Sequence, residues 1–231
     1  MSLTALDEKT LFRSAKDPSS PLACVIAGSD EANALLAEWD NESVSLVFVA
    51  CRDWNSQLSP WPAPACFKGG GAFTGGADAF LSEITENLLP AAERALGLKP
   101  CARAIAGESL AGLFALYALM KGGPFTMAAS VSGSLWFDGW AEYFLARPLP
   151  RNARVYLSLG DREEFTRNAR LSAVGERTRE AYALLLSMGI ESTLEMNPGN
   201  HFAEPEKRMA KALRWLFDPS RVTPFSERAV F

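Results

Sequence analysis

One serine lies in a context that could make it a nucleophile. Ser109 sits in Gly107-Glu108-Ser109-Leu110-Ala111-Gly112, after the apolar run at residues 102–106 and before an amphipathic run. A strand, a Gly-x-Ser-x-small turn and a helix in this order form a nucleophile elbow, whose strained turn needs small residues two positions from the serine. The pattern predicts Ser109 as a nucleophile and the Leu110 N–H, at the start of the helix, as an oxyanion donor. The alternative is a plain N-cap serine on a core helix.

His201 is the only histidine in the chain. It follows the expected last strand at residues 192–196 and precedes the expected last helix at residues 204–217. A serine hydroxyl is a poor nucleophile unless a nearby base takes its proton, and hydrolases with such an elbow supply their histidine from this loop. A lone histidine also excludes H-E-x-x-H and multi-histidine metal centres. We therefore predict His201 as the general base; the alternative is a structural histidine satisfied by its neighbours.

A third residue should orient the histidine and balance its positive charge, and it should fall between the serine and the histidine in the chain. The expected strand at residues 154–159 is followed by Gly160-Asp161-Arg162-Glu163-Glu164. Asp161 is closest to the strand end, Glu163 has the longer reach from the turn, and Glu164 is expected to face solvent. These residues leave Asp161 and Glu163 as alternatives for the acid.

Short apolar runs alternate along the chain with longer runs whose apolar residues recur at helical spacing. Such alternation predicts an α/β fold, with a mostly parallel sheet and helices on both faces. The length suits a single domain over residues 1–231. The expected strands are residues 22–27, 44–51, 102–106, 127–132, 154–159 and 192–196, and the expected helices are residues 77–96 (broken or kinked at Pro90), 110–121, 136–146, 169–188 and 204–217.

Residues 52–76 interrupt this alternation with several prolines and glycines. The glycines match neither a P-loop nor G-x-G-x-x-G. A loop this long inside a compact domain usually has a function, so we expect a lid or a pocket wall. Aromatic residues near the expected C-terminal strand ends are predicted to line a pocket for an apolar or aromatic group, although each could be an ordinary core residue. They are Trp54, Trp61, Trp136, Phe137 and Phe202.

Composition narrows the class of protein. Hydrophobic residues make up 48% of the chain and the formal charge is −4, which is typical of a folded globule and argues against nucleic-acid binding. No apolar run approaches the ~20 residues of a membrane span, and the polar N-terminus is not a signal peptide, so we expect a cytoplasmic protein without a membrane partner. The apolar tail at residues 222–231 could pack against a second copy in a homodimer or against its own domain.

Cysteine spacing gives no sign of a metal or redox centre. The four cysteines, Cys24, Cys51, Cys66 and Cys101, include no C-x-x-C pair. We expect reduced thiols packed as small hydrophobes. Neither a metal nor an organic cofactor is implied.

Four motifs, in order from about residue 45 to 217, resemble an esterase branch of the α/β-hydrolases. This branch includes esterase D-like, enterochelin-esterase-like and feruloyl-esterase-like members, which commonly show S-x-S-L-W-[WF] and G-x-x-E. The resemblance implies a three-layer sandwich without a large cap domain, with Ser109 as nucleophile, His201 as base and Glu163 as preferred acid. The motifs are Gly107-Glu108-Ser109-Leu110-Ala111-Gly112-Leu113, Ser132-Gly133-Ser134-Leu135-Trp136-Phe137, Leu159-Gly160-Asp161-Arg162-Glu163 and Pro198-Gly199-Asn200-His201-Phe202.

Two departures from this family bear on the chemistry. Glu108 stands where many relatives carry His, and no H-G-G-G oxyanion loop is present. The turn Arg52-Asp53-Trp54-Asn55 occupies the position of that loop, so a backbone N–H of the Asp53–Trp54 region, assigned to Trp54, is predicted as the second oxyanion donor. The alternative is that Arg52 and Asp53 only pair with each other at the surface.

These features predict a serine hydrolase that cleaves a small-molecule carboxylic ester through an acyl-enzyme. A peptidase or an acyltransferase would use the same residues with a different leaving group or acceptor. The alternative from another class is a non-catalytic binding or scaffold protein that keeps the hydrolase fold.

Overall fold

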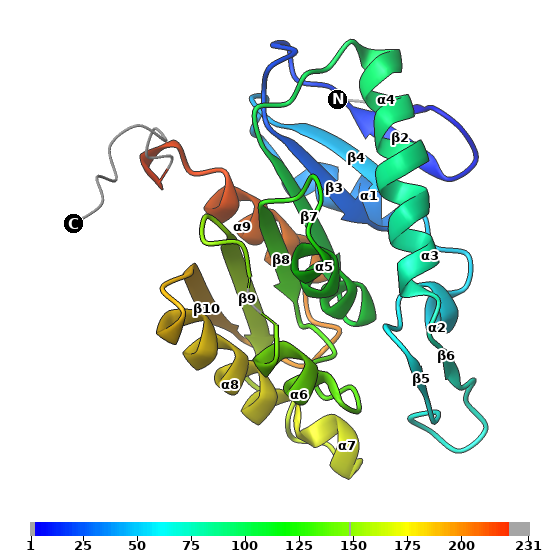
Figure 1. Cartoon of the computed structure of the whole chain (residues 1–231), viewed down its shortest axis with the longest axis vertical. Helices are drawn as coiled ribbons and strands as arrows, with labels where there is room; N and C mark the ends of the chain where they lie inside the picture. The colour runs from blue at the N-terminus through cyan, green and yellow to red at the C-terminus, as the bar shows by residue number, and fades with distance from the viewer. Residues whose placement is uncertain (1–2, 148, 222–231) are drawn as a thin grey trace.

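The computed structural model describes residues 3–147 and 149–221, and within them an eight-stranded sheet forms the centre of the molecule (Figure 1). The order across the sheet is β1-β2-β4-β3-β7-β8-β9-β10. Strands β4, β3, β7, β8, β9 and β10 run parallel, and β2 and β1 continue the sheet antiparallel. The bounds are β1 Thr4–Ala5, β2 Thr10–Arg13, β3 Leu22–Ile26, β4 Ser45–Val49, β7 Arg103–Glu108, β8 Met127–Val131, β9 Arg154–Gly160 and β10 Glu191–Asn197.

The predicted α/β architecture is confirmed, because helices cover both faces of the sheet. On one face lie α1 (Ser29–Glu38) and α9 (Pro205–Leu216), which contact each other. On the other lie α3 (Ala77–Ser82), α4 (Leu89–Leu96), α5 (Leu110–Lys121), α6 (Trp140–Leu145) and α8 (Val174–Ser187). The apolar residues of each face form a separate buried cluster. This is the three-layer sandwich expected from the alternating pattern.

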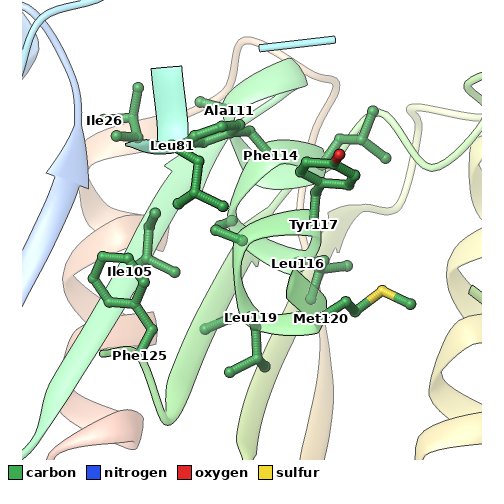
Figure 2. Packing of buried hydrophobic residues seen from close by; sticks show 14 of the residues in the cluster. Ile26, Leu81, Ile105, Ala111, Phe114, Leu116, Tyr117, Leu119, Met120 and Phe125 are labelled. Atoms are coloured by element: carbon green, nitrogen blue, oxygen red, sulfur yellow. The ribbon is translucent and has the colours of Figure 1, made fainter. Parts of the chain in front are cut away.

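Helix α5 is the centre of the larger cluster. Every residue of α5 except Lys121 is buried, as expected for a helix that is apolar all round. It packs on β7 and β8. Figure 2 shows its side chains surrounded by residues from the sheet and from α3, with Ile26, Leu81, Ile105, Ala111, Phe114, Leu116, Tyr117, Leu119, Met120 and Phe125 labelled. The serine that begins this helix therefore stands on a rigid element.

The expected helix at residues 77–96 is present, but the predicted break at Pro90 is wrong, because the helical run continues through this residue and changes its helical type before it. Helix α3 passes into a π-helical segment, η1 (Glu83–Leu88), which leads directly into α4. Pro90, which has no N–H to donate, is at the second position of α4, directly after the π-helical segment. The expected helix at residues 110–121 coincides with α5. Two others are shorter than expected: residues 136–146 contain only α6, and residues 169–188 divide into α7 (Ala169–Ser172) and α8. Helix α1 was not predicted.

Residues 52–76 contain the short helix α2 (Trp54–Gln57) and a small hairpin of β5 (Pro62–Ala63) and β6 (Phe73–Thr74). The hairpin projects from the sheet beside α7 in Figure 1. Asn168 Nδ2 donates to Cys66 O at 2.8 Å, and Arg170 Nη1 donates to Pro64 O at 2.7 Å. These bonds fasten the hairpin to α7.

Candidate active site

Ser109 occupies the strained turn between β7 and α5. Its backbone has φ 56° and ψ −123°, a region that side-chain-bearing residues rarely adopt. A Cβ on Gly107 would lie 2.4 Å from the backbone of Ala111, so only glycine fits there. The local sequence thus dictates the turn that raises the Ser109 hydroxyl above the carboxyl ends of the strands.

His201 reaches this hydroxyl from the loop between β10 and α9. Its Nε2 lies 3.1 Å from Ser109 Oγ, within hydrogen-bonding distance. The loop is fixed by backbone bonds to the turn after β9: Asp161 N donates to Asn197 O at 2.8 Å, and Arg162 N donates to Gly199 O at 3.1 Å. The structure therefore brings together the serine and the histidine that the sequence singled out.

Glu163, and not Asp161, touches the histidine. Glu163 Oε2 lies 2.7 Å from His201 Nδ1, and the Glu163 side chain is 2% exposed. Asp161 is exposed, and its Oδ1 accepts a hydrogen bond of 2.8 Å from Gly199 N. Of the two carboxylates left open by the sequence, Asp161 lies outside the serine–histidine chain because its short side chain braces the backbone of the histidine loop. Glu164, expected in solvent, is half-buried and pairs with Arg179 at 2.9 Å.

Three groups that the residue-based prediction did not identify hold Glu163. Its Oε1 accepts hydrogen bonds from Ser132 Oγ at 2.7 Å, from Gly160 N at 2.6 Å and from Arg208 Nη1 at 3.1 Å. Arg208, on α9, is 2% exposed and also donates from Nη2 to the carbonyls of Pro198 and Asn200. It therefore joins the acid to the loop that carries the histidine. The sequence of α9 has the pattern of an ordinary amphipathic helix, so nothing in it marks Arg208 as part of the site.

The ion pair shifts both pKa values away from their ordinary positions. Burial tends to raise the pKa of Glu163, but hydrogen bonds from His201, Ser132 and the Gly160 N–H together hold it below its usual value. Burial tends to lower the pKa of His201, whereas the hydrogen bond and charge of Glu163, with the charge of Glu108, raise it overall. The acid therefore stays ionised beside an imidazole with increased basicity.

Glu108, directly before the nucleophile, is half-buried, and burial raises its pKa to about 7. The folded chain therefore binds the proton of the Glu108 carboxyl group more tightly than the unfolded chain does. As a result, the free energy of unfolding falls as pH rises from 4.5 through about 7. We expect Glu108→Gln to stabilise the protein by about 2 kcal/mol at about pH 8 and to change little at about pH 5. Denaturant midpoints at the two pH values measure this difference. The exposed Glu86→Gln is the matched control, and an equal gain at both pH values would contradict the prediction.

The two residues predicted as oxyanion donors, Leu110 and Trp54, each begin a helix beside Ser109. Leu110 is the first residue of α5 and Trp54 is the first of α2, so neither N–H has a partner within its helix. Both residues line the cavity beside Ser109. The neighbouring N–H groups of Arg52 and Asp53 are already used, since both donate to Gln57 Oε1. Gln57 thereby fixes the turn that presents the Trp54 N–H.

The proposed surface pair between Arg52 and Asp53 is wrong. Arg52 pairs with Glu8 at 3.0 Å. The Asp53 side chain caps α2 by accepting from Ser56 N at 3.1 Å.

Ser134, which lies in the S-x-S motif, contacts the nucleophile directly. Its backbone N–H donates to Ser109 O at 2.9 Å, and its hydroxyl lies 3.4 Å from Ser109 Oγ.

A cavity of about 500 Å³ opens at Ser109 and His201. Trp54, Trp136 and Phe202 line it as predicted from the sequence. Trp61 and Phe137 do not: Trp61 Nε1 donates to Asp138 O at 2.8 Å, and Phe137 is 2% exposed within an aromatic cluster behind the wall. Apolar lining residues that the sequence analysis did not identify are Cys66, Phe67, Phe73, Phe165, Leu171 and Val174.

In the described part of the chain, no group of three His, Cys, Asp or Glu side chains is arranged to hold a metal ion. Among the same residues, no helix has the length and apolar character needed to cross a bilayer.

The four cysteines form no disulfide bond with one another. Cys24 is buried, but Cys101 is exposed and therefore not packed as expected. The predicted role of the tail at residues 222–231 lies outside the described residues.

The fold is that of an α/β-hydrolase. Residues 29–215 match the model of the family described as "Putative esterase", and the chain belongs to that family. It is thus an esterase-type hydrolase. It is 28% identical over 176 residues to "Uncharacterized protein YbbA" of Bacillus subtilis, covering 72% of this chain and 70% of that protein.

Solved structures share the fold. An IroE-like serine hydrolase from Shewanella oneidensis aligns with a TM-score of 0.75 at 18% identity, covering 90% of this chain and 75% of that one. The siderophore hydrolase EstA from Aspergillus nidulans gives a TM-score of 0.69 at 19% identity, with 90% and 88% covered. The enterobactin esterase FES from Shigella flexneri gives 0.71 at 21% identity, with 91% and 55% covered. At these identities the likeness concerns the fold alone.

Proposed function

We propose that the protein is a serine carboxylic ester hydrolase that works through an acyl-enzyme formed on Ser109. The observation that carries this proposal is the hydrogen-bonded series from Ser109 Oγ to His201 Nε2 at 3.1 Å and from His201 Nδ1 to Glu163 at 2.7 Å. These distances suit proton transfer from the hydroxyl to the ring. A plain helix-capping serine would not need an imidazole and a buried carboxylate behind it.

In this mechanism Ser109 Oγ attacks the ester carbonyl and its proton passes to His201 Nε2. Glu163 holds the Nδ1–H tautomer and balances the imidazolium charge. The Leu110 and Trp54 N–H groups stabilise the tetrahedral oxyanion, each worth about 3 kcal/mol in comparable enzymes. The intermediate collapses when the alkoxide leaves and takes the proton from Nε2. Water then attacks the acyl group with His201 as base, which releases the acid and restores Ser109.

Several aromatic and aliphatic side chains around the cavity favour an ester with a bulky apolar or aromatic group. They lie on the segment at residues 52–76, in the turns after β8 and β9, on α7 and the start of α8, and in the loop of His201. We assign the segment at residues 52–76 the role of a pocket wall, since hydrogen bonds from Asn168 and Arg170 fasten it.

The test is covalent labelling by a fluorophosphonate probe. We expect stoichiometric phosphonylation on the peptide that contains Ser109, because only an activated hydroxyl reacts. Ser109→Ala should abolish labelling, whereas Ser187→Ala, an exposed serine at the end of α8, should retain it. An unlabelled, folded wild-type protein would refute the proposal. Matched esters and anilides of one acid then separate esterase from peptidase activity.

A further inference from the structure

Arg162 is the one cationic side chain among the described residues that line the cavity. The other charged lining residue is Glu163, which is engaged by His201 and Arg208. The remaining wall is mostly apolar. Within the described residues, the Arg162 guanidinium forms no ion pair or hydrogen bond, and it is exposed to solvent.

The carboxylates nearest to Arg162 in the chain are all engaged elsewhere. Asp161 accepts from Gly199 N, and Glu163 holds His201 and Arg208. Glu164 pairs with Arg179 at 2.9 Å. Arg170, which also lies at the wall, differs because it pairs with Asp138 at 2.9 Å. A positive charge without a counterion therefore remains at the cavity.

The backbone that carries this charge is tied to the loop of the catalytic histidine. Arg162 N donates to Gly199 O at 3.1 Å, two residues before His201, and Arg162 O accepts from Phe165 N at 3.3 Å. Asn200, another lining residue, uses its Oδ1 to accept from Phe202 N, which leaves the Nδ2 donor without a protein partner in the described residues. A guanidinium binds a carboxylate through two parallel hydrogen bonds, and an amide N–H can add a third.

We propose that the ester substrate carries a carboxylate, separated from the ester by an apolar or aromatic body, and that Arg162 binds this carboxylate. The inference rests on the proposed esterase function and adds the substrate class. The apolar part would fill the aromatic cavity, the ester carbonyl would meet Ser109, and the anion would pair with the free guanidinium. Arg162 then acts as a specificity residue.

The experiment compares kcat/KM for two 4-nitrophenyl esters of similar shape, the hydrogen terephthalate and the 4-methylbenzoate. The para carboxylate cannot reach its own ester and so cannot assist its hydrolysis, and the rates of hydrolysis by hydroxide correct for the intrinsic difference in reactivity. We expect wild type to prefer the anionic ester about 10-fold or more, mainly through KM, because hydrogen bonds to charged groups are the stronger ones. Arg162→Gln should bring the ratio close to unity, and Arg162→Lys should keep part of the preference. The cavity is open to either end of an ester, so the comparison is repeated with 4-carboxyphenyl and 4-methylphenyl acetates.

Arg167→Gln is the matched control, since it removes one exposed positive charge from the same loop at a residue that does not line the cavity. It should keep the preference. The inference is overturned if Arg162→Gln leaves the ratio unchanged for both ester pairs, or if Arg167→Gln lowers it equally. Labelling of Ser109 in the same preparations distinguishes failure of this inference from failure of the proposed esterase function. Intact labelling without an anion preference overturns only this inference, whereas absent labelling and absent hydrolysis overturn the esterase proposal as well.

Discussion

Replacing His201 with glutamine is expected to lower kcat/KM for an ester by about 10⁶-fold, as loss of the histidine does in a comparable serine hydrolase. His201 is the only imidazole in the chain, so no other histidine can take over the proton transfer. Glutamine keeps similar bulk and can still accept a hydrogen bond from Ser109. The change should therefore remove the base and leave the turn around Ser109 in place, which near-UV circular dichroism and the melting temperature can check.

Two further measurements make this prediction specific. In the wild type, kcat/KM should rise with pH above the ordinary histidine pKa of 6.5, because activity needs the neutral ring and the charges of Glu163 and Glu108 raise its pKa. His201→Gln should abolish this rise. The double variant Ser109→Ala/His201→Gln should lose no more activity than either single variant, since residues that act as one unit are non-additive. The assigned role of His201 would be contradicted if the loss in the double variant equalled the product of the two single losses. A residual activity of more than about 1% in His201→Gln would contradict it as well.

The fold could be read from the sequence because its central strands are buried on both faces. β4 and β8, for example, are buried at every residue, and such strands read as continuous apolar runs. The edge strand β1 and its neighbour β2 have no such signal: β1 is two residues long and exposed. Helix α1 was missed because it buries only Ala32 and Leu35, too few for a recognisable apolar stripe.

The serine and the histidine could be predicted because each depends on a local pattern, a strained turn and a unique residue. The lining of the pocket could not be predicted in the same way, because it depends on the side of each loop from which an aromatic side chain projects. Phe137 turns into the core while its neighbour Trp136 lines the cavity, and Phe165 is exposed at the mouth although nothing in its sequence context marks it. Arg208 was missed for a related reason, since its role arises only when α9 docks behind the histidine loop.

The choice between Asp161 and Glu163 leads to the second large effect. Glu163→Gln is expected to lower kcat/KM by about 10⁴-fold, because an amide can stabilise the wrong imidazole tautomer and cannot balance the imidazolium. The negative charge of Glu163 also raises the pKa of His201. The acid limb of the remaining activity should therefore move to lower pH, and this shift distinguishes an orienting acid from a merely structural carboxylate.

Asp161→Asn is the matched control, because it also neutralises one carboxylate of the same turn. Its Oδ1 accepts only from Gly199 N, a bond that an asparagine oxygen can keep, so we expect kcat/KM within about threefold of wild type. Glu163→Gln leaves Arg208 buried without its counterion, which should cost about 3 kcal/mol of stability, so rates must be measured well below the melting temperature. Equal losses in the two variants, or a larger loss in Asp161→Asn, would return the acid role to Asp161.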